Sequence, residues 1–378
     1  MLELNCHTIK EINHQPQMWL DTFDIVLSHK SEIEKFVSVN KLSKDTRIIL
    51  TGAGTSAFTA DAAECVFTKA GFAGAKAVAT TDIVSAPESF LDPDDRLFIS
   101  FARSGNSPES VAAYNIARKY CKDALHLIIT CNPEGQLAKG ADPDKDVVIV
   151  LPDGTNDRSL AMTSSFSSML IACILCVDIV NIEKHKPELE AAADFVKRFL
   201  KDDVIENIKA IAAKDIKRAV FLGSGVLKGI ACECHLKLQE LTDGAVMCSF
   251  DSFMGLRHGP KAVINEETLV VYLLSEQPYT KQYELDLIDQ VDKENKPAAQ
   301  VIVSTVPSGV KGCKIDFEVN ADKDIENLVK GDFKFVPYVL IGQLFGYFFS
   351  RAHGLDPDAP SVRGTISRVV KGVTIYEY

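Results

Sequence analysis

RIILTGAG, residues 47–54, and RAVFLGSG, residues 218–225, are the stretches that decide the fold. Each is an apolar run of strand length that ends in glycines just before a helical pattern. Three further apolar runs follow each stretch, at residues 96–101, 125–131 and 147–152 in the first series and at 268–275, 299–306 and 314–319 in the second. The first two runs start 49 residues apart in one series (47 to 96) and 50 in the other (218 to 268). The sequence therefore contains an internal repeat.

The repeat predicts an α/β protein with two similar lobes. Near-continuous apolar strands that alternate with helices are typical of parallel sheets with helices on both faces. We expect four segments: a helical lead-in (1–46), a first lobe (47–190), a helical connector (191–217) and a second lobe with a C-terminal tail (218–378).

Composition excludes several classes of partner. Of the 378 residues, 46% are hydrophobic and 25% charged, which is ordinary for a globular protein, and the net charge of −11 argues against nucleic acid or an anionic membrane as partner. Residues 1–26 lack the apolar core of a targeting peptide. The longest apolar run, residues 169–177, is shorter than the roughly 20 residues that a bilayer requires and predicts a core helix.

The ten cysteines predict neither a disulfide framework nor a metal site. Cys173 and Cys176 form a CxxC pair, but they lie inside an apolar helical pattern without further ligands at matching spacing. Cys65, Cys232 and Cys248, like this pair, have apolar or small neighbours, and we interpret all five as buried free thiols of a cytoplasmic protein.

Two strand ends of the first lobe predict an anion site, because ligands of open α/β sheets bind beyond the carboxyl ends of the strands. Ser107 precedes Pro108 and is the expected N-cap of the following helix, whose N-terminus favours a phosphate. The candidate ligands offer hydroxyl, amide or guanidinium groups at the two corners: Thr55, Ser56, Arg103, Ser104, Asn106 and Ser107. The alternative is that Ser107 only caps its helix. Neither corner has the spacing of a nucleotide-binding loop.

A helix of the second lobe carries candidate proton-transfer groups. Glu233, Lys237 and Glu240 follow an i, i+4, i+7 spacing, which places them on one face. A carboxylate beside a lysine at a ligand site can move a proton between adjacent carbons. The alternative is a solvated face of ion pairs, but the leucines interleaved with these residues favour a buried helix.

His258 is a second candidate for proton transfer. Gly259 and Pro260 follow it and break regular structure, so we expect the imidazole to be presented on a loop. Histidine exchanges protons near neutral pH. The alternative is a structural or incidental loop histidine.

Five ordered motifs together resemble a pair of sugar isomerase (SIS) domains: GAGTSAF, SFARSGNSPES, SLAMTSSF, HLKLQELTDG and GLRHGPKAVI. The chain is most similar to the AgaS family, and the likeness extends from residues 13–20 to residues 365–375. The resemblance implies two tandem SIS lobes, a sugar-phosphate substrate, no metal or other cofactor, and a homodimer or higher homo-oligomer.

The isomerase half of glucosamine-6-phosphate synthase is a more distant likeness that implies residue roles. Its phosphate loop resembles residues 104–107, with Ser56 contributing, and its ring-opening histidine, supplied by a neighbouring subunit, resembles His258. Its proton-shuttling glutamate resembles Glu240, with Glu233 and Lys237 beside it, and its near-terminal lysine resembles Lys371. The chain departs from this relative at Ala102 and Arg103, where the synthase has Ser-Gln.

The resemblance leads us to expect conversion of D-galactosamine 6-phosphate to tagatose 6-phosphate with release of ammonia. Thr163 and Ser164, in SLAMTSSF, are expected to line the sugar. One alternative is ketose/aldose isomerisation of a neutral sugar phosphate, which needs the same residues. The other is a phosphosugar sensor without catalysis.

Overall fold

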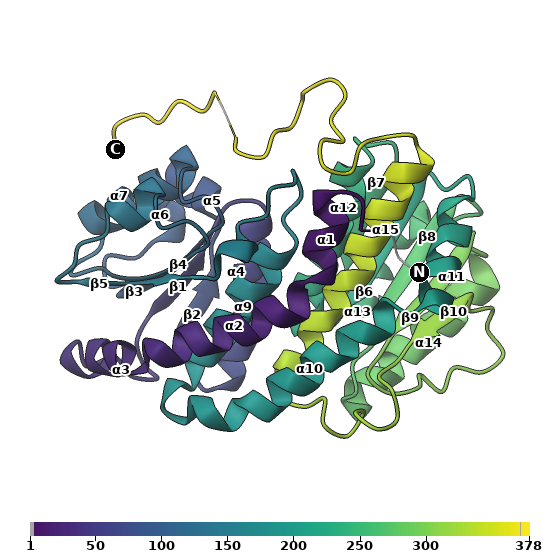
Figure 1. Cartoon of the computed structure of the whole chain (residues 1–378), viewed down its shortest axis with the longest axis horizontal. Coiled ribbons are helices and arrows are strands. Elements are labelled where there is room, and N and C mark those ends of the chain that lie inside the picture. Colours follow the sequence, from purple (N-terminus) through teal and green to yellow (C-terminus); the bar gives the residue numbers. More distant parts are fainter. Residues whose placement is uncertain (1–3, 371) are drawn as a thin grey trace. The chain divides into compact units, whose positions relative to one another are not determined.

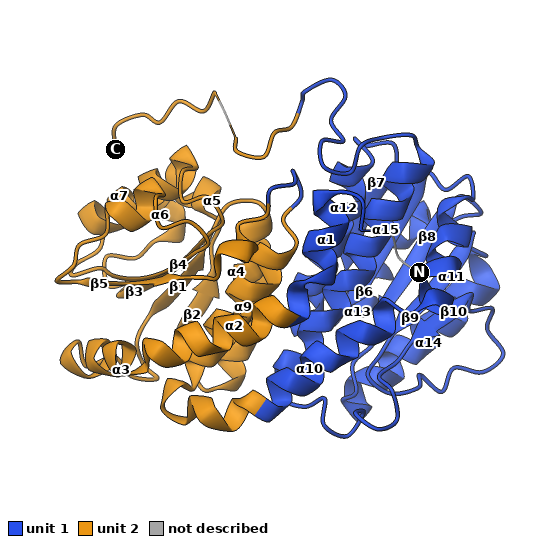
Figure 2. Ribbon diagram, in the orientation of Figure 1, with its two compact units in different colours: residues 1–16, 158–161, 187–365 blue, residues 17–157, 162–186, 366–378 orange. Residues whose placement is uncertain are grey.

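The computed structural model describes residues 4–370 and 372–378. The chain forms two compact units, each built from three separate segments of the sequence (Figure 2). One unit contains residues 17–157, 162–186 and 366–378 and is called the first lobe here; the other contains residues 1–16, 158–161 and 187–365 and is called the second lobe. Each has one five-stranded parallel sheet with flanking helices, which confirms the predicted fold class. The expected boundaries at residues 46, 190 and 217 stay predictions.

The sheet of the first lobe has the order β2-β1-β3-β4-β5. Its strands are β1 (Ile48–Thr51), β2 (Ala75–Ala77), β3 (Leu97–Ala102), β4 (Leu125–Thr130) and β5 (Asp146–Val150). All four pairings are parallel, with Ile48 opposite Leu97. The short edge strand β2 was not among the predicted strands, because its sequence AKA lacks β-branched residues.

Helices cover both faces of this sheet (Figure 1). The helices of the lobe are α2 (Gln15–Ser28), α3 (Lys30–Val39), α4 (Thr55–Lys69), α5 (Thr80–Ser85), α6 (Pro87–Phe90), α7 (Pro108–Tyr120), α8 (Gln136–Lys139), η1 (Asp153–Thr155), α9 (Ser164–Val177) and η2 (Ile179–His185). Ile49, Phe98 and Ala113 belong to the core cluster between the sheet and α7. The predicted core helix, residues 169–177, is the second half of α9, which is buried from Ser164 to Leu175 and is apolar on every face from Met169 onward.

The sheet of the second lobe, β10-β9-β8-β6-β7, repeats the topology of the first. Its strands are β6 (Arg218–Gly223), β7 (Met247–Asp251), β8 (Thr268–Leu273), β9 (Ala299–Val303) and β10 (Phe317–Val319). The first strand in chain order again pairs with the second and third, all in parallel, which confirms the internal repeat. The edge strand β7 was not predicted, because it is half exposed and lacks a continuous apolar run.

The helices of the second lobe are α1 (His7–Asn13), α10 (Lys186–Phe199), α11 (Asp202–Ala212), α12 (Val226–Leu241), α13 (Phe253–Leu256), η3 (Pro260–Val263), α14 (Pro278–Glu294), η4 (Phe333–Tyr338) and α15 (Val339–Ala352). Helices α12 and α15 pack closely because two glycines of α15 remove side chains from the contact. A Cβ on Gly342 would lie 2.5 Å from Cys234 Cα, and one on Gly346 would lie 2.8 Å from the Lys237 carbonyl oxygen.

All ten cysteines are free thiols, as expected, although Cys65, Cys176 and Cys248 are only partly buried. Among the described residues no single helix has the length and apolar composition of a membrane span. One bent pair, α9 and the segment Ile179–Phe199, meets both criteria together across a 118° bend.

Candidate active site

The turn from β1 to α4 forms the first corner of the predicted anion site. A Cβ on Gly52 would lie 2.5 Å from the backbone carbon of Ser56, and Gly54 has a φ of +57°. Only glycine fits both positions without strain, so the chain can turn directly into α4. Thr55 and Ser56 occupy the first turn of this helix, and each is 4% exposed.

The turn from β3 to α7 forms the second corner. Ser107 has extended backbone angles and precedes Pro108 at the first helical position, as predicted for the N-cap. Its hydroxyl does not cap the helix: it donates to Ser110 Oγ at 2.6 Å. In the first turn of α7, Pro108 has no N–H, and the N–H groups of Ser110 and Val111 donate to the Ser107 carbonyl oxygen at 3.1 and 3.3 Å. The Glu109 N–H is thus the backbone donor of this turn that a bound anion could use.

The loop at the second corner is held in place by the segment that follows β4. Asn132 Nδ2 donates to the Ser104 carbonyl oxygen at 2.8 Å, and Asn106 Oδ1 accepts the Gln136 N–H at 3.0 Å. Gly105 has a φ of +63°, and its carbonyl oxygen accepts the Leu137 N–H at 2.9 Å. These contacts hold the loop against the segment that follows β4. Asn132 was not identified from the sequence, because its contact joins positions that are 28 residues apart.

Arg103 is buried, and the structure shows its guanidinium donating to the Arg368 carbonyl oxygen in the C-terminal tail. Arg368 in turn donates to the Asp157 carbonyl oxygen and to Asn156 Oδ1, each at 2.7 Å. Arg103 therefore links the phosphate-loop candidate to the tail. Its contact with phosphate stays a prediction, and Lys371 lies outside the described residues.

Thr163 and Ser164 are fully buried in a network around the Asp157 carboxylate. Asp157 accepts the backbone N–H groups of Thr163 at 2.8 Å and Ser165 at 2.9 Å, and it accepts the Ser164 hydroxyl at 2.5 Å. The carboxylate thereby caps the N-terminus of α9. Asp157 was not singled out in the sequence, since no local pattern distinguishes it from a turn aspartate.

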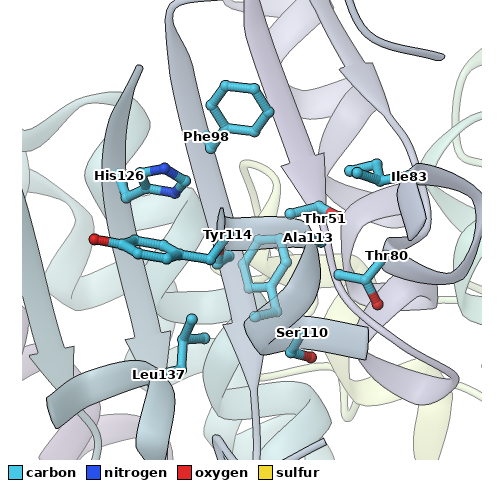
Figure 3. A pocket seen from close by; sticks show the side chains of 11 residues that line it. Thr51, Thr80, Ile83, Phe98, Ser110, Ala113, Tyr114, His126 and Leu137 are labelled. Atoms are coloured by element: carbon cyan, nitrogen blue, oxygen red, sulfur yellow. The ribbon is translucent and has the colours of Figure 1, made fainter. Parts of the chain in front are cut away.

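A small internal cavity of about 10 Å³ lies between the sheet and α7 in the first lobe (Figure 3). That volume suits about one water molecule. The His126 ring stacks on Phe98 and lies 4.3 Å from the Tyr114 ring, measured between centroids. Ser110, which accepts the Ser107 hydroxyl, also lines the cavity. The cavity therefore adjoins the second corner.

His126 is 1% exposed, and neither ring nitrogen has a hydrogen-bond partner among residues 4–370 and 372–378. Burial, with a smaller contribution from the charge of Arg118, lowers the pKa of His126 to about 3. The ring is therefore neutral near pH 7 and does not serve as an acid.

In the second lobe, α12 brings Glu233, Lys237 and Glu240 together as its spacing predicts. Lys237 Nζ lies 3.1 Å from Glu233 Oε1 and also forms a short ion pair with Glu240. Glu233 and Lys237 are completely buried, which excludes the alternative of a solvated face. The Glu240 side chain is 15% exposed, so it is the member of the cluster that can reach a ligand.

Lys237 is the charge centre of this cluster. Burial by itself would lower the pKa of Lys237, but the carboxylates of Glu233 and Glu240 outweigh it and raise that pKa above the ordinary value. The lysine therefore stays protonated and holds the Glu240 carboxylate through an ion pair.

His258 lies on an exposed turn after α13, as predicted. Its backbone N–H donates to the Gly255 carbonyl oxygen at 3.0 Å. Gly259, with a φ of +118°, turns the chain into η3. The imidazole is thus available to a ligand or to another molecule.

The described ranges 4–370 and 372–378 contain no group of three or more His, Cys, Asp or Glu side chains that could hold a metal ion. The candidate chemistry of these residues is anion binding in the first lobe and proton transfer in the second.

The chain resembles known proteins over nearly its full length. Residues 41–177 match the family model described as SIS domain. The chain is 36% identical over 375 residues to D-galactosamine-6-phosphate deaminase AgaS from Escherichia coli, covering 98% of this chain and 96% of the relative.

Solved structures show the same likeness. Tagatose-6-phosphate ketose/aldose isomerase from Escherichia coli superposes with a TM-score of 0.85 at 32% identity, covering 99% of this chain and 97% of that one. The C-terminal domain of glucosamine-fructose-6-phosphate aminotransferase from Francisella tularensis shares the fold, with a TM-score of 0.78 at 21% identity, covering 94% and 98%. The chain therefore belongs to the AgaS family of SIS-domain sugar isomerases.

Proposed function

We propose that this chain is a deaminating isomerase that converts D-galactosamine 6-phosphate and water to tagatose 6-phosphate and ammonia. The observation that carries the proposal is the α12 cluster, in which a buried lysine holds the partly exposed Glu240 carboxylate. Family membership supports the substrate class, since the E. coli relative is named as a galactosamine-6-phosphate deaminase.

The first lobe binds the phosphate group. Ser104 donates a hydroxyl hydrogen bond to the phosphate, and the Ser107 hydroxyl turns to it from Ser110. The Glu109 N–H in the first turn of α7 adds a backbone donor, and Thr55 and Ser56 contribute from the first corner. Asn106 supports the loop through its contact with Gln136. Thr163 and Ser164 act next to the sugar through the Asp157 network.

His258 opens the sugar ring by moving a proton from the anomeric hydroxyl to the ring oxygen, which leaves an aldehyde at C1. Its exposed position supports donation to a second copy of the chain, so we propose that a homodimer or higher homo-oligomer is the active species. The free cysteines support a cytoplasmic location.

Glu240 then acts as base and acid in turn. It removes the proton from C2 while O1 takes up a proton, which gives an enolamine. It then returns the proton to C1 as the amino group loses one, so that C1 becomes a hydroxymethyl group and C2 an imine. Water adds to the C2 imine, the C–N bond breaks and ammonia leaves, giving the ketose. Lys237 and Glu233 position Glu240, and we assign Lys371 to the same step from the resemblance alone.

The test is ammonia release by the purified chain from galactosamine 6-phosphate and from glucosamine 6-phosphate. We expect release from the galacto sugar and a drop of about 10²- to 10⁴-fold in Glu240→Gln, which is the range for loss of a positioned general acid or base. Glu267→Gln, at a half-exposed glutamate outside α12, is the matched control. No release from either sugar by the unmodified chain would contradict the proposal.

A second candidate function is isomerisation of a neutral sugar phosphate without loss of nitrogen. It is favoured by the likeness to tagatose-6-phosphate ketose/aldose isomerase, because the same transfer from C2 to C1 serves both reactions. Formation of ketose from an aldose 6-phosphate without any ammonia release would identify it. Phosphate-dependent binding with neither reaction would identify a sensor.

A further inference from the structure

The second lobe repeats the corner geometry of the first. Gly54 and Gly225 stand at equivalent positions with φ and ψ of 57° and −128° in one and 60° and −128° in the other. A Cβ on Gly52 would clash with Ser56, and one on Gly223 would clash with Leu227, four residues later in both cases. The backbone at the end of β6 therefore has the shape that receives a ligand at the end of β1.

The side chains at this second corner differ. Val226 and Leu227 replace the hydroxyl pair Thr55 and Ser56 in the first turn of the helix. The helix that follows β8 is capped by its own sequence, since Gln277 Oε1 accepts the Thr280 N–H at 2.9 Å. The second lobe has thus lost the donors expected to hold a phosphate.

A carboxylate of the chain occupies this corner instead. Glu284, on α14, is completely buried, and its Oε2 accepts the Ser275 N–H at 2.8 Å. Ser275 follows β8, and the side chain of Ser224, which follows the neighbouring strand β6, lies near enough to the same carboxyl group to lower its pKa. One carboxyl group therefore lies at the ends of the two strands between which an α/β sheet binds its ligand.

Strand register shows which residue of the first lobe corresponds to Ser275. Ile48 pairs with Leu97 in the first lobe, and Ala219 pairs with Leu269 in the second. Six residues further along each third strand stand Arg103 and Ser275. Ser275, whose N–H binds Glu284, thus occupies the position in the second lobe that Arg103 occupies in the first, directly before residues 104–107.

Burying the Glu284 carboxyl group costs free energy of folding, which calls for a role that offsets it. A buried carboxylate loses its hydration, and a hydrogen bond to each oxygen is needed to offset that loss. Oε1 of Glu284 has no hydrogen-bond partner in the part of the chain that the structure describes. Burial raises the pKa of Glu284 above its ordinary value, while the nearby Ser224 side chain and the Ser275 N–H oppose the rise.

We infer that Glu284 is an internal anion that closes the second lobe's copy of the phosphate corner and so restricts each chain to one phosphate site. The inference rests on the proposed function only in placing that single site at residues 104–107. It assigns Glu284 a specificity role: it prevents a sugar phosphate from binding in the lobe that supplies the proton-transfer groups.

The test is chemical rescue of Glu284→Ala by small anions. Thermal unfolding is followed at pH 7 in sodium chloride, sodium acetate and sodium phosphate of equal ionic strength. We expect Glu284→Ala to unfold several degrees below the unmodified chain, and acetate or phosphate, but not chloride, to recover at least half of the difference. Glu284→Gln fills the corner with an amide and is expected to show no rescue. An equal response of Glu284→Ala to chloride and to acetate would overturn the inference.

Phosphate stoichiometry provides a second test that does not depend on the stability of that variant. Calorimetric titration of the unmodified chain with inorganic phosphate should give one site per chain, and Ser104→Ala/Ser107→Ala should abolish it. A second site in the unmodified chain, or a site that survives the double variant, would overturn the inference. Anion rescue without any ammonia release would overturn the proposed function alone.

Discussion

Lys237 and Glu233, one turn apart on α12, form an ion pair of 3.1 Å in which both side chains are completely buried. A pair removed from water in this way contributes little net stability, but a single partner left behind is strongly destabilising. The relationship explains how a helix inside the second lobe keeps charged groups beside Glu240.

Lys237→Met should therefore destabilise the chain. Removing the lysine leaves two carboxylates without their shared cation, at a cost of about 3–5 kcal/mol for a broken buried pair. Urea unfolding measures the change, and Lys228→Met, at an exposed lysine of the same helix, is the control. If both variants unfolded at the same urea concentration, the buried pair would not have the role described.

Ser107→Ala should weaken binding of the sugar phosphate with little change in kcat. A hydrogen bond to a charged group contributes about 1.5–3 kcal/mol, so we expect KM to rise about tenfold or more. Steady-state kinetics of ammonia release measure both constants, with Ser89→Ala, at an exposed serine, as control. A fall in kcat at unchanged KM would place Ser107 in the chemical step instead.

His126 should make the fold sensitive to acid. Its pKa of about 3 in the folded chain lies below the ordinary value of 6.5, so the unfolded chain binds the extra proton between these limits. The free energy of unfolding should therefore fall as the pH decreases through this window, by about 1.5–2 kcal/mol from pH 6.5 to pH 5.

The matching variant is His126→Phe, which keeps a ring between Phe98 and Tyr114. It should lose this part of the acid sensitivity, whereas His353→Gln, at an exposed histidine, should retain it. Urea unfolding at pH 6.5 and pH 5 decides the matter. Parallel losses of stability in the unmodified chain and in His126→Phe would show that other groups are responsible.

Asp157→Asn should destabilise the first lobe. The amide would place N–H donors opposite the Thr163 and Ser165 N–H groups, and each buried donor left unsatisfied costs about 1–3 kcal/mol. Unfolding in urea measures the loss, and Asp153→Asn, at an exposed aspartate nearby, is the control. Stability unchanged within error in Asp157→Asn would mean that the network does not cap α9 as described.

Sequence periodicity predicted most of the fold because it reports local burial. The eight predicted runs coincide with β1, β3, β4, β5, β6, β8, β9 and β10, and five of these strands, β1, β3, β4, β8 and β9, are buried along their whole length. The strands β2 and β7 were not predicted, because their sequences AKA and MCSFD contain no continuous apolar run, whereas the other two edge strands, β5 and β10, were predicted. Local rules also located the two corners and the shared face of Glu233, Lys237 and Glu240, since glycine turns and helical spacing depend only on near neighbours.

By itself, then, the sequence determined the repeat, the strand ends and the helix face that holds the acids. Only the tertiary structure decided which of these groups remain open to a ligand. Arg103 contacts a tail residue 265 positions away, and Asp157 joins a turn to the start of α9. Glu284 binds the Ser275 N–H just beyond β8, the strand that precedes its own helix. The Arg103 contact depends on how distant segments pack, and the contacts of Asp157 and Glu284 on how a helix folds back on the turn before it, which no short sequence pattern encodes.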